Sequence, residues 1–240
     1  MAFSDLTELE ILQGTLGLIW VLIAIIIGIR IIHKALLLKR TSDLITVAFS
    51  YILVSSAWWG LSLQFIMYGF FNILLEEVFY LLISNIFIPF AMICWIYSYC
   101  KILDPKRKEY LLKGFIIFTS LWELFIFVGL FIDIRLVGTL NSKFDSSHGP
   151  LLLVFILIGI ASFLITGTVF AFKSMKLEDP EVQWKGRFLL LAWICFAVGA
   201  LLDAALPLTA ITLILVRAVL ILSAISFYFG FFLPKKLVIN

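Results

Sequence analysis

The chain has 240 residues, of which 63% are hydrophobic and 14% are charged, and its formal net charge is +3. So few charged residues cannot cover the surface of a water-soluble globule, which excludes that class of protein. The positive balance requires no nucleic-acid partner, because basic loops beside an anionic membrane leaflet account for it.

Seven apolar segments follow one another through almost the entire chain. Each provides the roughly 20 residues that a helix needs to cross a hydrocarbon core of about 30 Å. Because lipid offers the backbone no hydrogen-bond partner, each segment must be a helix. The sequence therefore predicts an all-α membrane protein, with one heptahelical domain over residues 1–240. The predicted spans are Ile11 to His33, Leu44 to Tyr68, Val78 to Tyr99, Leu111 to Ile132, Leu151 to Phe172, Phe188 to Leu206 and Leu208 to Phe232.

Local signals mark several helix starts. The residues before the first span are acidic, whereas a signal peptide begins with basic residues, so we expect this span to be retained. Thr7 and Glu10 have the spacing of a capping box. Asp104-Pro105 and Asp179-Pro180 each predict an N-cap followed by proline at the first helical position. The residues around these two pairs are similar. Either a helix pair was duplicated, or the two connections use the same capping residues independently.

The basic residues are distributed unevenly between the two sides of the predicted bundle. Fifteen of the 18 Lys and Arg residues lie at one side, whereas the other side has only Arg135 and Lys143. Under the positive-inside rule, the N-terminus lies outside and the C-terminus lies in the cytoplasm. The expected location is the cell membrane, which the chain crosses several times.

Motifs for catalysis, metals and cofactors are absent from the sequence. There is no HExxH, GxSG or P-loop pattern, and no lysine in the last span that could bind retinal covalently. The three cysteines form no CxxC pair, and His33 and His148 lie at a helix end and in a loop. We therefore expect no enzyme activity, no metal site and no cofactor.

Two ionisable residues lie deep within predicted spans. Glu123 and Arg217 are each ten residues from the outer end of their helix, or about 15 Å below the outer boundary. Such groups cost about 2.5–3.5 kcal/mol each to insert, so they are functional candidates. In an ordinary ring of seven helices, the fourth and the seventh are not neighbours. Glu123 and Arg217 can therefore share a hydrogen-bond network only across a centre filled with water or a ligand. We expect Arg217 to balance an anionic ligand group or Glu123.

Other polar and tryptophan side chains lie in the same outer half. Pro89 cannot donate to the carbonyl of Asn85, which predicts a bend in the third helix. We also note Gln13 and Asp203 in this half, and Glu76 and Glu77 near its outer mouth. The alternative is that these groups only join helices, by hydrogen bonds worth about 0.6 kcal/mol each. The predicted ligand-binding residues are Trp58, Trp59, Gln64, Asn85, Glu123 and Arg217.

The longest outer connection runs from Asp133 to Pro150 and contains Ser, Gly and Asp residues. Connections of this kind lie at the surface and often carry function. We expect it to be a mobile lid over the pocket or a simple tether.

A set of short motifs lies in the second, third and last predicted spans. It consists of Ala57 to Leu61, Phe65, Glu76 to Phe79, Asn85 to Pro89, Trp95 to Tyr97 and Phe227 to Pro234. These motifs resemble one known region, the N-terminal seven-helix sensor region of prokaryotic membrane histidine kinases. This resemblance implies an outward-facing bundle that senses a ligand or a membrane state and drives a cytoplasmic kinase. Only six residues follow Pro234, so we expect any signal to pass to a separate protein.

The leading hypothesis is a receptor-like sensor with an outward-facing polar pocket for a small ligand. The alternative is a transporter or channel for a small solute or a lipid-like molecule. A lipid-modifying enzyme and a structural membrane subunit are further alternatives. The expected partners are membrane lipids, a small-molecule ligand and a cytoplasmic signalling protein, but no nucleic acid. The sequence does not indicate an oligomeric state.

Overall fold

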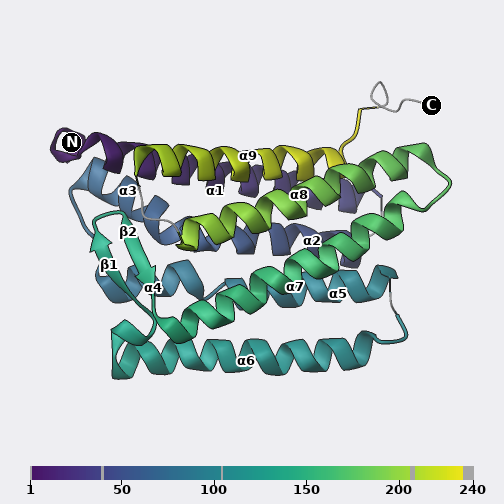
Figure 1. Ribbon diagram of the computed structural model, residues 1–240, viewed down its shortest axis with the longest axis horizontal. Coiled ribbons are helices and arrows are strands. Elements are labelled where there is room, and N and C mark those ends of the chain that lie inside the picture. Colours follow the sequence, from purple (N-terminus) through teal and green to yellow (C-terminus); the bar gives the residue numbers. More distant parts are fainter. Residues whose placement is uncertain (1, 39–40, 104, 206–208, 235–240) are drawn as a thin grey trace.

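The protein folds into a bundle of apolar helices that run along one long axis (Figure 1). The computed structural model describes residues 2–38, 41–103, 105–205 and 209–234. Within them, seven helical segments are long and apolar enough to span a membrane, which confirms the number of predicted spans. The unbroken spans are α1 (Glu8–Leu37), α6 (Lys108–Ile132), α7 (Pro150–Met175), α8 (Pro180–Ala205) and α9 (Ala210–Phe231).

The second and third spans are each built from two helices. The second consists of α2 (Thr41–Val54), the 3₁₀ turn η2 (Ser55–Trp58) and α3 (Trp59–Phe71). The third consists of α4 (Glu77–Asn85) and α5 (Ile88–Leu103). Pro89 stands at the start of α5, where its missing N–H accounts for the predicted break in this span. The sequence did not predict the 3₁₀ turn in the second span.

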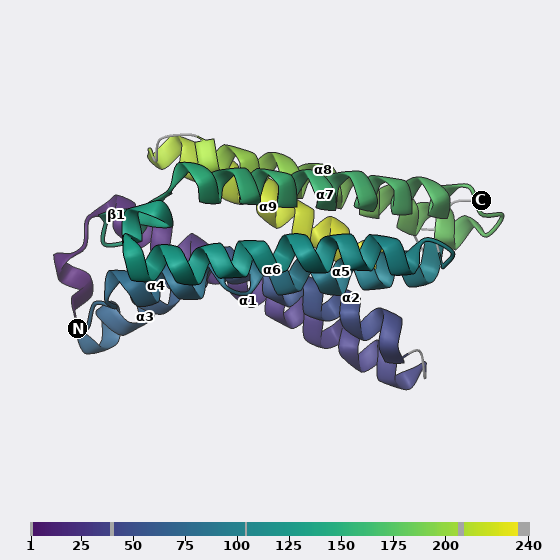
Figure 2. The ribbon, with the colours of Figure 1, turned by 90° about the horizontal axis from the view of Figure 1, so that it is seen from below.

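Six of the spans form a closed ring, and α6 lies outside it. α1 packs against α2, α3 and α9; α8 packs between α7 and α9; and α5 packs against both α2 and α7. α6 packs mainly on α5, with fewer contacts to α4 and α7, and Figure 2 shows it at the front of the bundle. Only 22% of its most apolar window is buried, the smallest share among the seven spans.

Local capping signals explain two helix starts and fail for a third. The predicted capping box forms, with the Glu10 amide donating to Thr7 Oγ1 at 3.3 Å. Asp179 caps α8 as predicted, because its carboxylate accepts the Glu181 amide at 2.8 Å. α6 begins at Lys108 and not at Pro105, so that prediction was wrong; proline permits a helix start without forcing one. Asp104, Leu206 and Leu208, where other boundaries were predicted, lie outside the described residues.

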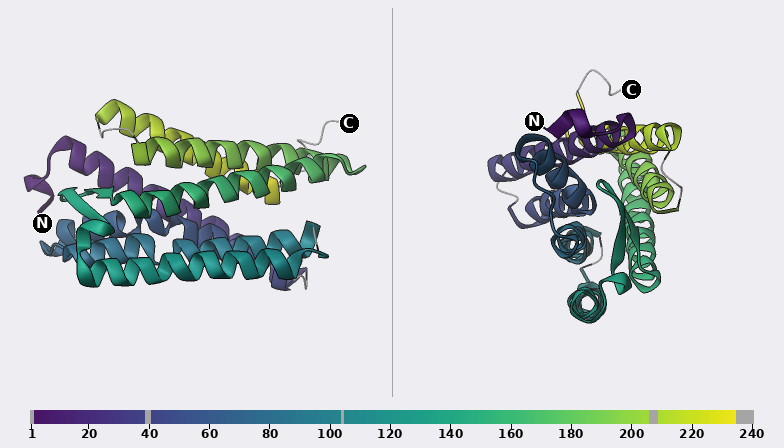
Figure 3. Two further views of the ribbon diagram at one scale, coloured as in Figure 1. Left: turned by 60° about the horizontal axis from the view of Figure 1, so that its bottom comes forward. Right: turned by 90° about the vertical axis from the view of Figure 1, so that its left-hand side faces the viewer.

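The long outer connection is an ordered hairpin. After the short turn η3 (Ile134–Leu136), strands β1 (Gly138–Ser142) and β2 (Asp145–His148) pair antiparallel. Val137 and Phe144 are buried, at 0% and 1% exposure, so the hairpin is anchored at its base and at its turn. The end-on view in Figure 3 shows it lying across the middle of the ring. This small sheet is an addition to the predicted all-α fold.

Candidate functional site

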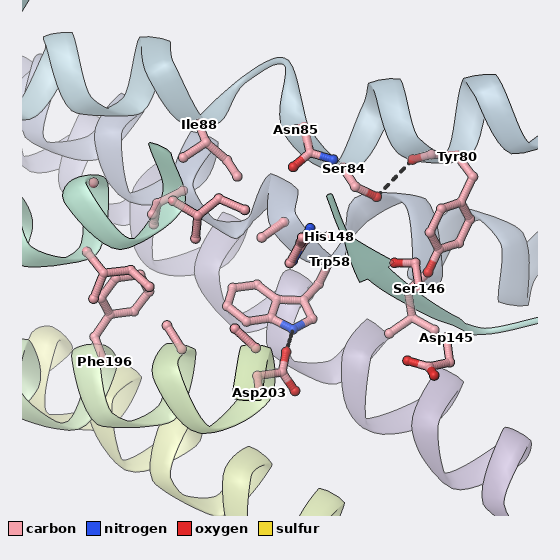
Figure 4. Close-up of a pocket in the computed structure, with 18 of the residues that line it drawn as sticks. Trp58, Tyr80, Ser84, Asn85, Ile88, Asp145, Ser146, His148, Phe196 and Asp203 are labelled. Carbon is pink, nitrogen blue, oxygen red and sulfur yellow. Dashed lines mark hydrogen bonds between the residues drawn. The ribbon is translucent and has the colours of Figure 1, made fainter. Parts of the chain in front are cut away.

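A cavity of about 120 Å³ lies inside the ring beneath the hairpin (Figure 4). At about 30 Å³ for each water, it has room for about four water molecules, or for a solute of roughly five or six heavy atoms. Its polar wall comes from Gln13, Trp58, Tyr80, Ser84, Asn85, Asp145, Ser146, His148, Asp203 and Arg217. Its apolar wall comes from Val54, Ala57, Leu61, Ile88, Phe144, Ile156, Gly159, Ile160, Phe163, Phe196, Ala200 and Ala204.

Arg217 is paired within the cavity wall. One guanidinium nitrogen donates to Asp203 Oδ2 at 3.2 Å, and Trp58 Nε1 donates to the same oxygen at 2.8 Å. The guanidinium carbon also lies 5.6 Å from the centre of the Trp58 ring. Both α8, which carries Asp203, and α9, which carries Arg217, belong to one tightly packed helix pair. The buried positive charge is therefore balanced by a neighbour on the adjacent helix.

This pairing corrects the expectation that Arg217 shares a network with Glu123. Glu123 lies on α6, outside the ring, and is not among the residues that line the cavity. Its two carboxylate oxygens are buried and have no hydrogen-bond partner among the described residues. The sequence placed the two residues at similar depth, but the packing order of the helices separates them.

The other predicted site residues divide between the cavity and its surroundings. Trp58 and Asn85 line the cavity, as do Gln13 and Asp203, which the sequence had singled out as nearby polar groups. Trp59 does not line it; its ring nitrogen donates to Ser55 Oγ at 3.0 Å. Whether Trp58, Asn85 or Arg217 binds a ligand stays a prediction.

Gln64 belongs to the contact between the bundle and the hairpin. Its amide nitrogen donates to the Lys143 carbonyl, and its amide oxygen accepts the Leu75 amide at 3.1 Å. It is 1% exposed but does not line the cavity. The structure therefore places this predicted ligand residue in the contact that holds the turn of the hairpin.

Three polar atoms in the cavity wall lack a partner among the described residues. They are Asn85 Oδ1, Arg217 Nε and His148 Nδ1. The Asn85 side chain is oriented by its amide nitrogen, which donates to the Leu81 carbonyl at 2.8 Å. A buried polar atom without a partner costs about 1–3 kcal/mol. Water or a bound solute in the cavity would satisfy all three atoms.

His148 is a cavity residue that the sequence analysis assigned no role. Figure 4 shows it beside Trp58, and it reaches this position because β2 folds back over the bundle. Burial lowers the pKa of His148 below its usual value of 6.5, although Asp203 and Asp145 act in the opposite direction. No local motif marks the residue, because its place depends on the hairpin.

Side-chain contacts attach the hairpin to the bundle. Glu77 Oε1 accepts the Leu140 amide at 2.8 Å, and Lys143 Nζ donates to the Tyr68 hydroxyl at 3.1 Å. The same hydrogen bond raises the pKa of Lys143. Phe144 packs edge-on against Phe65, with ring centres 5.7 Å apart. The hairpin is therefore a fixed cap on the cavity.

A second, smaller cavity of about 10 Å³ continues from the first towards the opposite end of the bundle. The two cavities share Val54, Phe163 and Phe196 as walls. Tyr51 OH and Trp193 Nε1, on residues that line the smaller cavity, have no partner among the described residues. This volume holds about one water molecule. The apolar side chains that both cavities share lie between the two spaces.

The described residues contain no group of three or more His, Cys, Asp or Glu side chains that could hold a metal ion. Comparisons with protein families, curated proteins and solved structures found no match for this chain. The resemblance to histidine-kinase sensor regions therefore stays a prediction.

Proposed function

We propose that this protein is a receptor-like membrane sensor, which binds a small molecule in the larger cavity and signals to a separate cytoplasmic protein. The observation that carries the proposal is a solute-sized cavity that lies at the breaks of two spans. Three polar atoms of residues in its wall have no partner among the described residues. Stable burial of such atoms in an empty space is unfavourable, so the cavity is better suited to an occupant than to pure helix packing.

In the proposed orientation, the hairpin and the N-terminus face outward and the C-terminus lies in the cytoplasm of the cell. The end of the bundle away from the hairpin carries most of the basic residues, which supports this orientation under the positive-inside rule. Four of these residues, Lys39, Arg40, Lys235 and Lys236, lie outside the described residues.

The broken spans provide a route from the cavity to the cytoplasmic end. α2 and α5 both begin or end at a break beside the cavity and run from there to the opposite end. They are joined by the hydroxyls of Thr46 and Ser98, 2.6 Å apart, and by an ion pair of 3.1 Å between Lys101 and Asp43. An occupant that shifts either break would therefore move the two helices together.

A tethered occupant tests this proposal without knowledge of the ligand. Ala57 is exposed and lines the cavity, so Ala57→Cys, in a chain whose native cysteines are replaced, offers one thiol there. Modification with 2-hydroxyethyl methanethiosulfonate should change amide hydrogen exchange at residues 94–103 several-fold.

The matched control is Ala161→Cys, because Ala161 is exposed on α7 and does not line the cavity. Its modification should leave exchange at residues 94–103 unchanged. The sensor proposal fails if the Ala57→Cys protein reacts fully and its exchange pattern does not change.

Transport is the second candidate function, and two observations favour it. Discontinuous helices beside a central site are typical of secondary transporters, and two spans are broken at this cavity. The smaller cavity also continues the larger one across the shared apolar side chains. In vesicles of uniform orientation, a transporter should let a membrane-impermeant thiol reagent reach Ala57→Cys from either side. A sensor should admit it from the hairpin side alone.

A further inference from the structure

The charges that line the larger cavity do not cancel. Arg217 and Asp203 neutralise each other through their 3.2 Å contact. Asp145 is the third formally charged side chain in the wall. Among the described residues, no ion pair joins it to a basic side chain. Its carboxylate accepts one hydrogen bond, from the Asn141 amide at 3.1 Å. The lining therefore has an excess of one negative charge.

Nearby ionisable groups outside or within the wall do not remove this excess. Lys143 is directed to Tyr68, with its nitrogen 4.5 Å from the ring centre, and it does not line the cavity. Glu77 is bonded to the hairpin backbone and is also outside the lining. His148 does line the cavity, but its burial favours the neutral imidazole.

The cavity is also divided into a polar end and an apolar end. In Figure 4, Tyr80, Asp145 and Ser146 gather at one end, whereas Ile88 and Phe196 lie at the other. In this view the Tyr80 hydroxyl points towards Ser146, and the Asp145 carboxylate lies beyond Ser146. An elongated molecule with one polar and one apolar end matches this division.

We propose that the cavity binds a small organic cation, with its ammonium group at Asp145 and its apolar part towards Ile88 and Phe196. This inference rests on the proposed function and names the ligand class of the same site. It replaces the expectation of an anionic ligand. An anion at the unpartnered Arg217 Nε would share one guanidinium with Asp203, and with Asp145 it would leave two negative charges in the wall uncompensated, which is unfavourable.

Three probes of similar size and different charge test the proposal. Butylamine, 1-butanol and butanoate each have about five or six heavy atoms, which the cavity can hold. Binding to the purified full chain in nanodiscs would be measured by calorimetry at pH 7. Protonated butylamine should bind at least tenfold more tightly than 1-butanol, and butanoate should bind most weakly.

Asp145→Asn should reduce the affinity for butylamine at least tenfold and leave that for 1-butanol unchanged. The matched control is Asp133→Asn, which removes the same charge from an exposed position in the same connection. This control should bind all three probes like the parent protein. The proposal is overturned if butanoate binds as tightly as butylamine, or if butylamine shows no binding at millimolar concentration.

A kinetic measurement tests the same charge without depending on probe affinity. The thiol of Ala57→Cys should react faster with the 2-(trimethylammonio)ethyl methanethiosulfonate than with the 2-sulfonatoethyl reagent, after correction for their rates with 2-mercaptoethanol. Adding Asp145→Asn should bring the corrected ratio close to one. A faster reaction with the anionic reagent would overturn the proposal. The sensor test attaches an uncharged group to the same thiol. The sensor proposal and the proposal of a cationic ligand can therefore fail independently of each other.

Discussion

At the scale of single residues, Asp203 connects two other residues of the cavity wall, although it is not among the predicted ligand-binding residues. One of its oxygens accepts hydrogen bonds from both Trp58 and Arg217. Arg217 is 2% exposed, so its charge depends on this contact. Removing one member of a buried ion pair leaves the other uncompensated, which typically costs about 3–5 kcal/mol.

Asp203→Asn should therefore lower the free energy of unfolding by about 3 kcal/mol or more. Thermal or denaturant unfolding in detergent, followed by circular dichroism, measures this loss. The double variant Asp203→Asn/Arg217→Gln removes both charges and should recover a large part of the stability, because the two sites are directly coupled. Strictly additive losses in the double variant would contradict the pairing.

Glu123→Leu should have the opposite effect on stability. The Glu123 carboxylate is buried without a hydrogen-bond partner among the described residues, so it contributes desolvation cost and no pairing. Replacing it with leucine should raise the free energy of unfolding by about 1–3 kcal/mol. The same unfolding assay applies, and a destabilised Glu123→Leu protein would reveal a partner that binds this carboxylate.

His148 predicts a pH dependence of stability. Burial lowers its pKa in the folded protein below the usual 6.5, so the unfolded chain binds more protons in this range. Stability should therefore fall as the pH drops through 6.5 towards the folded-state pKa. Melting temperatures from pH 8 to pH 5 should decline less in His148→Gln. His33→Gln, at an exposed position in α1, is the control and should decline like the parent.

At the scale of elements, the hairpin and the two broken spans shape the site. Gly60, at the start of α3, lies so close to α4 that an added Cβ would be 2.7 Å from the Tyr80 carbonyl. This close approach brings the break in the second span next to the break in the third. The hairpin then covers the resulting cavity, and its buried anchor is Phe144.

Phe144→Ala should loosen the hairpin more than it destabilises the bundle. Truncating a fully buried phenylalanine costs about 3–5 kcal/mol, and the short hairpin over residues 138–148 can detach without unfolding the helices. Amide exchange at residues 138–148 should accelerate at least tenfold, while exchange within α8 and α9 stays the same. Arg135→Ala, at an exposed position in the turn just before the hairpin, should leave the exchange unchanged.

At the scale of the whole molecule, the closed ring and the charge distribution define two different ends. One end has the hairpin and the cavity beneath it, and the other has the basic connections. In the proposed topology the number of spans is odd, which places the two ends of the described residues on opposite sides of the membrane.

The proposed orientation predicts which positions an impermeant reagent can reach in intact cells. In a chain without native cysteines, Ser147→Cys on the hairpin should be labelled from outside. Glu178→Cys, in the exposed connection between α7 and α8, should be labelled only after the cells are permeabilised. The reverse pattern would invert the orientation and place the cavity near the cytoplasm.

The sequence by itself determined the seven spans, the capping of α1 and α8, and the break near Pro89. These features depend on local hydropathy, on short-range hydrogen bonds and on the missing amide of proline. It also identified Trp58, Asn85 and Arg217, which do line the cavity, because polar groups within apolar spans are conspicuous. Only the tertiary structure decided that Arg217 pairs with Asp203, that Glu123 lies outside the ring, and that His148 and Asp145 reach the cavity. Those outcomes depend on which helices are neighbours and on where the hairpin lies, and residues far apart in the sequence set both through packing.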